Sequence, residues 1–227
     1  MDHNAFGRLA DDVDQQHQAA MTGLLRRRQF LKRAGIGGAV VAVGASTASV
    51  AGLLSNASAQ TASTEELDDG DLGLVQYLQT IELAAARVYE TAIGTRKLDA
   101  VYEEASRSFS QHHVDYAAAL ATLAAKSALD EANSTLVSSV TPALSAATSS
   151  DAVLASLFQL ERSCAATYQL ALASIESADV AAVLSTIQPI EGEMTTAWGQ
   201  VLELPIEQWM PAFVTDAEAY QPAQYAV

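Results

Sequence analysis

Three glutamates and one histidine occupy positions where a helical bundle would normally place apolar side chains. Glu82, Glu161, Glu191 and His113 each fall on a stripe of residues with spacings of three and four. Burying one unpaired carboxylate costs roughly several kcal/mol, so three of them require a metal ion, bound protons or water nearby. Carboxylate and imidazole groups bind iron, manganese and zinc, and these four residues are therefore the candidate metal ligands.

Four long amphipathic helices are expected to position these residues. The apolar spacing predicts them near residues 71–93, 98–125, 151–175 and 178–204, with Asp71 as the N-cap of the first helix. Short loops join the first helix to the second and the third to the fourth, so each pair should form an antiparallel hairpin. The Ser/Thr-rich segment 127–150 is then a long crossover. The predicted fold class is all-α, a four-helix bundle with a short C-terminal tail.

The two hairpins carry an internal repeat. The segment LQTIELAAARVYETAI (residues 78–93) aligns without gaps on LFQLERSCAATYQLAL (residues 157–172), which matches Glu82 with Glu161 and Tyr89 with Tyr168. In the second helix of each hairpin, SQHH (residues 110–113) lies opposite EGEM (residues 191–194). The hairpins are therefore expected to face each other across a twofold axis, with both tyrosines as core aromatics whose hydroxyls are hydrogen-bonded.

With these features the sequence resembles the ferritin-like superfamily, in particular exported ferritin-like domain proteins similar to desiccation-associated proteins. The resemblance covers about residues 73–214. In metal-binding members, the resemblance implies, the first and third helices each supply one glutamate, and the second and fourth each supply a Glu-x-x-His pair. These six ligands together hold two iron or manganese ions. Glu82, Glu161, Glu191 and His113 match four of these positions.

The other two ligand positions have changed. Ser110 stands where the second helix should carry its glutamate, and Met194 stands where the fourth should carry its histidine. The site should therefore hold either no cofactor or a single Fe, Mn or Zn ion, and no catalytic residue is assigned. One hypothesis is a non-catalytic structural, stress-associated or partner-binding protein. The alternative is a metal-binding protein or oxidoreductase with a reduced site.

Neighbours of the candidate ligands receive other interpretations. His112 and Glu193 are predicted to lie on the surface, and Cys164 is predicted to be a small buried side chain. His113 has two interpretations, a metal ligand or a core histidine hydrogen-bonded to Glu82 or Glu191.

The amino-terminal region contains a pattern that resembles a twin-arginine export signal. A basic cluster leads into an uncharged Ala/Gly/Val stretch and a small-x-small cleavage pattern at Ala57 and Ala59. The motif residues are Arg27, Arg28, Phe30, Leu31 and Lys32. This predicts an exported protein, secreted or associated with the cell surface, that engages the twin-arginine machinery. The alternative is an uncleaved membrane anchor over residues 34–54.

These features divide the chain into a signal region (1–59), a flexible acidic linker (60–72), the bundle (73–204) and the tail (205–227). Cleavage after Ala59 would leave six basic and 23 acidic residues, a net charge of −17. Such a charge argues against nucleic acid as a partner and limits membrane contact to an uncleaved leader. It is also typical of halophilic proteins, and the alternative is an ordinary acidic secreted protein. The remaining partner is an unknown protein or a second copy of the chain.

Overall fold

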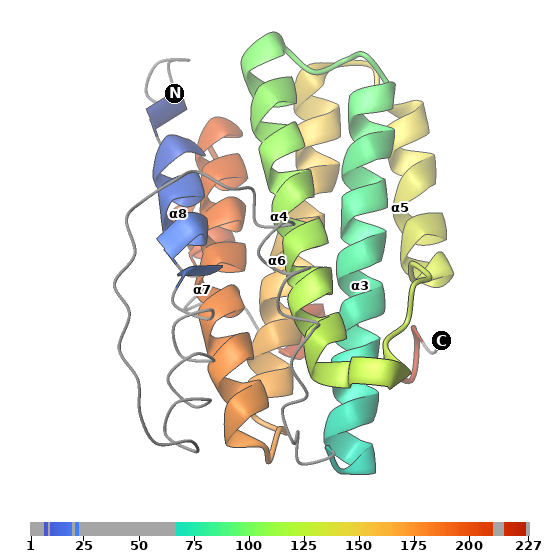
Figure 1. Ribbon diagram of the computed structural model, residues 1–227. Helices are drawn as coiled ribbons and strands as arrows, with labels where there is room; N and C mark the ends of the chain where they lie inside the picture. The colour runs from blue at the N-terminus through green and yellow to red at the C-terminus, as the bar shows by residue number, and fades with distance from the viewer. Residues whose placement is uncertain (1–6, 9, 20, 23–66, 211–215, 226–227) are drawn as a thin grey trace.

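Four long helices form the body of the protein. The computed structural model describes residues 7–8, 10–19, 21–22, 67–210 and 216–225, and these contain helices and no strand. The long helices are α3 (Asp69–Gly94), α4 (Ala100–Ala124), α6 (Ser150–Leu172) and α7 (Ala178–Val201). As Figure 1 shows, α3 packs along α4 and α6 along α7. This arrangement confirms the predicted all-α bundle.

The first helix begins earlier than predicted. Its N-cap is Asp68, whose carboxylate accepts hydrogen bonds from the backbone N–H groups of Gly70 and Asp71 at 2.8 and 2.9 Å. Asp71, the predicted cap, is instead a buried residue of the first turn. It accepts hydrogen bonds from the N–H groups of Glu176 and Ser177 at 3.1 and 2.6 Å. The predicted role of Asp71 was therefore wrong, because its carboxylate caps the loop before α7 and not its own helix.

The crossover contains a helix that the sequence interpretation missed. Helix α5 (Ser134–Ala146) begins after Asn133, whose side-chain oxygen accepts a hydrogen bond from the N–H of Leu136 at 3.0 Å. Leu136 and Leu144 are fully buried, and α5 lies against α3 and α6. Figure 1 shows it beside α3. The crossover is thus a packed part of the bundle and covers the outer side of α3.

The tail also packs on the bundle. It contains the single turn α8 (Ile206–Trp209) and a 3₁₀ turn over Asp216–Glu218. Trp209 lies so close to α7 that a Cβ on Gly199 would come within 2.3 Å of it, so this position requires glycine. Further along, the Tyr77 hydroxyl donates a 2.6 Å hydrogen bond to the Tyr220 carbonyl.

Part of the predicted signal region lies on the same bundle. Residues 10–19 form a helix, called here the amino-terminal helix, which Figure 1 draws in blue beside α7. Val13 and Met21 are buried, and residues 21–22 are helical as well. The predicted signal motif and cleavage residues, 27–59, fall outside the described residues. Within the described part of the chain, no helix combines the length and apolar character needed to span a membrane.

Candidate metal centre

The structure brings all four candidate ligands to the centre of the bundle. Glu82 comes from α3, His113 from α4, Glu161 from α6 and Glu191 from α7, and the exposed fraction of each is 0%. The spacing of three and four places each residue on the inner face of its helix, and the two hairpins bring those faces together. Every long helix therefore contributes one titratable group to one buried cluster.

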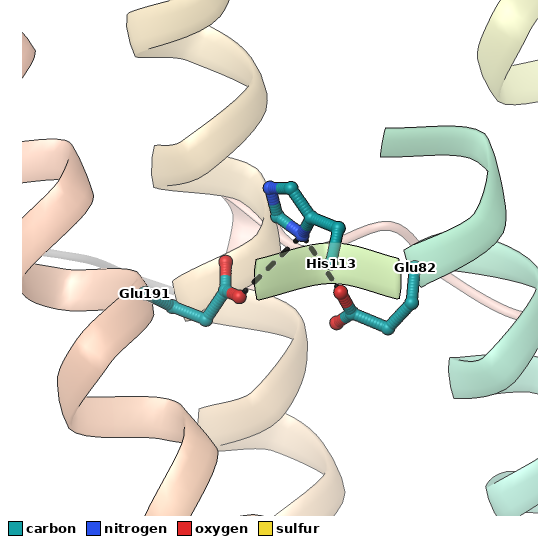
Figure 2. Close-up of side chains that lie close together, drawn as sticks. All are labelled: Glu82, His113 and Glu191. Carbon is teal, nitrogen blue, oxygen red and sulfur yellow. Dashed lines mark hydrogen bonds and ion pairs between the residues drawn. The ribbon is translucent and has the colours of Figure 1, made fainter. Parts of the chain in front are cut away.

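His113 lies in the middle of this cluster. Its Nδ1 is 2.7 Å from Glu82 Oε2 and 3.7 Å from Glu191 Oε1, while its Nε2 is 3.2 Å from Glu161 Oε1. Figure 2 shows one imidazole nitrogen facing the carboxylates of both Glu82 and Glu191. One ligand atom from each of Glu82, His113 and Glu191 lies within 4.8 Å of the others. Both nitrogens of the histidine are thus engaged with carboxylates.

Two tyrosines complete the cluster by reaching across the hairpins. The Tyr168 hydroxyl donates a 2.6 Å hydrogen bond to Glu82 Oε1. The Tyr89 hydroxyl donates to Glu161 Oε1 and accepts from Trp198 Nε1 at 2.8 Å. Burial, followed by the charge of the partner glutamate, raises the pKa of each tyrosine well above 10. Both hydroxyls therefore remain protonated and act as donors.

Glu191 is the member without such support. Within the described part of the chain neither of its carboxylate oxygens accepts a hydrogen bond, and Glu161 Oε2 also lacks a donor. Burial, and next the negative charge of Glu82, raise the pKa of Glu191 well above 4.5. The negative charge of Glu161 raises the pKa of Glu191 further. A proton held on Glu191 would allow it to donate to Glu161, which would satisfy both orphaned carboxyl groups.

The surroundings of His113 favour its charged form. Burial alone would lower its pKa, but the neighbouring carboxylates, Glu161 above all, outweigh burial and hold the pKa well above 6.5. Hydrogen bonds to Glu161 and Glu82 act in the same direction. An imidazolium has two N–H donors, which matches the carboxylate oxygen near each ring nitrogen. The cluster can therefore close as a hydrogen-bonded network of one cation and three carboxyl groups that share protons.

The residues at the centre do not fit a pair of metal ions. The hydroxyl of Ser110 donates to the Ala86 carbonyl at 3.3 Å, so it is turned to the backbone of α3. Met194 is fully buried, and its thioether suits softer ions than Fe(II) or Mn(II). By contrast, Glu82, His113 and Glu191 offer two carboxylates and one imidazole, a donor set that fits a single Fe, Mn or Zn ion.

Three arginines of the described helices do not neutralise the cluster. Arg87 and Arg107 are exposed, and Arg162 pairs with Glu218 in the tail at 2.5 Å. Cys164 is buried as predicted. Burial and then the charge of Glu191 raise the pKa of its thiol well above 9, so the group stays a neutral thiol.

One surface prediction was wrong, and a second holds only in part. His112 is only 3% exposed, because the amino-terminal helix covers it: Asp14 Oδ1 lies 2.9 Å from His112 Nε2 and the ring of His17 stacks on its imidazole. Glu193 is half-buried, and burial raises the pKa of its carboxyl. The residues that cover these two side chains lie before residue 60, in a region that was predicted to be separate from the bundle. Without them, both side chains were expected to face solvent.

The comparison with known families agrees with the fold. The model of the ferritin-like domain family matches residues 70–203, from the start of α3 to just beyond α7. This match spans more than half of the chain, and the protein belongs to the ferritin-like domain family. No curated protein and no solved structure shows significant similarity to the chain.

Proposed function

We propose that this chain is an exported ferritin-like protein with a degenerate di-metal site and a non-catalytic structural, stress-associated or partner-binding role. The observation that carries the proposal is the buried network around His113, in which Glu82 and Glu161 each accept hydrogen bonds from the imidazole and from a tyrosine. Such a network stabilises the apo bundle without an ion. The changes at Ser110 and Met194 support the same conclusion, because coupled oxidase chemistry needs two metals.

Chelation tests the structural role of the centre. The thermal unfolding of the full chain should be the same before and after treatment with a strong chelator, because protons and hydrogen bonds hold the centre together. A fall in melting temperature of several degrees, reversed by Fe, Mn or Zn, would contradict this role.

A single-metal protein is the second candidate. It is favoured by the oxygens of Glu191, which lack a hydrogen-bond donor and lie with Glu82 and His113 in a suitable donor set. In that case the ion would displace the protons of the cluster and supply Lewis-acid or redox chemistry. Glu82, His113 and Glu191 would bind it, while Tyr168 would orient Glu82 through its hydrogen bond.

Export is tested separately from the centre. Replacing Arg27 and Arg28 together by Lys keeps the charge but removes the paired guanidinium groups. The precursor should then remain inside the cell, whereas Arg33→Lys, outside the central pair, should be exported normally. Normal amounts of exported double variant would refute the twin-arginine assignment and leave the proposal for the centre intact.

A further inference from the structure

The amino-terminal helix is held on the bundle by specific contacts. Val13 is 1% exposed and His17 is 2% exposed, so one face of the helix is as closely packed as the core. Gln18 and Gln15, on the other side, are exposed. This burial pattern is that of an amphipathic helix whose apolar face packs against the bundle.

The polar contacts between the helix and α4 are reciprocal. Asp14 of the helix pairs with His112 of α4 at 2.9 Å, and His17 of the helix pairs with Asp115 of α4 at 3.0 Å. Between the two pairs the imidazole rings of His17 and His112 stack, with their centroids 3.9 Å apart and their planes within 12°. Each helix therefore contributes one acid and one imidazole to the same interface.

Two further hydrogen bonds fix the position of the helix along α4. The Ser108 hydroxyl donates to Asp14 at 2.6 Å, and the Tyr116 hydroxyl lies 3.1 Å from His17 Nδ1. The α4 residues in these contacts share one side of the helix, because they follow one another at spacings of four, three and one: Ser108, His112, Asp115 and Tyr116. They form what is called here the α4 surface. On this surface His112 faces an acid and Asp115 faces a histidine of the amino-terminal helix, and that acid and histidine are three residues apart.

We propose that the α4 surface is a recognition site for a helix with an Asp-x-x-His motif, and that residues 14–17 of the same chain occupy it as an intramolecular cap. The cap keeps the surface closed for as long as the amino-terminal region is attached. Its removal, as in a chain cut after Ala59, would leave His112 and Asp115 without these partners and open the surface to another helix of the same pattern. The proposal stands on the contacts of Asp14 and His17 and does not depend on metal binding or on export.

Hydrogen exchange of the full chain tests the cap. In the unaltered protein the amides of residues 13–19 should exchange about tenfold or more slowly than in the double variant Asp14→Asn, His17→Gln, which keeps side-chain size but removes both acid–imidazole pairs. Gln18→Ala, an exposed change on the same helix, should keep the protection. Asp115→Asn, which removes the α4 partner of His17, should reduce the protection of residues 13–19. Unchanged exchange in α3 would show that the bundle remains folded in every variant.

The dependence of this amide protection on protein concentration identifies which helix occupies the α4 surface. Protection that is the same at low and high protein concentration supports a cap within one chain, because an intramolecular contact does not dissociate on dilution. Protection that disappears on dilution would show that a second copy supplies the helix and would overturn the intramolecular cap. Equal exchange of residues 13–19 in the unaltered protein and the double variant would overturn the recognition site itself.

Discussion

The hydroxyl of Tyr168 donates a 2.6 Å hydrogen bond to Glu82 Oε1, so a tyrosine of the second hairpin supports the carboxylate of the first. The repeat-related Tyr89 does the same for Glu161. These exchanged contacts connect α3 with α6 at the level of the buried cluster. Two reciprocal contacts of this kind are expected if the hairpins face each other across a twofold axis.

Removal of one of these hydroxyls should destabilise the protein. Tyr168→Phe keeps the ring but leaves Glu82 without one of its donors, and a buried hydrogen bond to a charged group contributes about 2 kcal/mol. We expect the free energy of unfolding to fall by that amount in chemical denaturation. Tyr225→Phe, whose ring lies in the tail and outside the cluster, is the matched control. Equal stability of the two variants would show that the Tyr168 contact does not support the centre.

The proton on Glu191 should make stability depend on pH in a defined direction. Burial, followed by the charge of Glu82, raises the folded-state pKa of Glu191 well above its ordinary value of 4.5. Holding this proton stabilises the folded protein fully at pH values below the pKa that Glu191 has in the unfolded chain. The stabilisation is lost as the pH rises through the higher pKa that Glu191 has in the folded protein. The raised pKa of His113 acts in the same direction, with its loss beginning above 6.5.

Glu191→Gln should reduce this loss, because the amide keeps the shape of the protonated carboxyl and does not ionise. At neutral pH the variant should be as stable as the unaltered protein or more stable, and its unfolding free energy should change less between pH 5 and pH 9. Glu82→Gln is the informative contrast, since it weakens bonds to His113 and Tyr168. A variant Glu191→Gln that loses stability at every pH would indicate that the ionised carboxylate is required.

Restoring the two changed ligand positions should restore metal binding. The double variant Ser110→Glu, Met194→His completes the six-ligand set of metal-binding ferritin-like proteins and should bind about two Fe or Mn ions per chain. Ser110→Gln with Met194→Leu changes the same positions without adding ligands and should not. A folded Glu/His variant that binds no additional metal would show that more than these two residues has been lost.

The helical spacing alone predicted the inward direction of Glu82, Glu161, Glu191 and His113, because a period near 3.6 residues fixes which side of a helix faces the core. It did not predict which atoms meet. The contact of His113 with Glu161 depends on how the hairpins are placed relative to each other, and spacing within one helix carries no such information.

The missed elements share a different cause. In α5, Leu136 and Leu144 form the buried face of the helix. The many Ser and Thr residues around them are typical of a loop, so the helix was not predicted. For His112 the covering residues, Asp14 and His17, precede it by about a hundred positions and lie before a leader-like sequence. A pattern that is local in sequence could not connect them. The leader itself, with its motif at Arg27 and Arg28, stays a prediction.

Metal analysis of the full chain, isolated from its own cells without added metal, tests the central claim most directly. If the cluster of Glu82, His113, Glu161 and Glu191 is closed by shared protons, the protein should contain far less than one equivalent of Fe, Mn or Zn, and His113→Ala should not change that content. Ser110→Ala, next to the cluster but outside its donor set, is the control. One equivalent of metal per chain, lost in His113→Ala and kept in Ser110→Ala, would contradict the account and identify a single-metal protein.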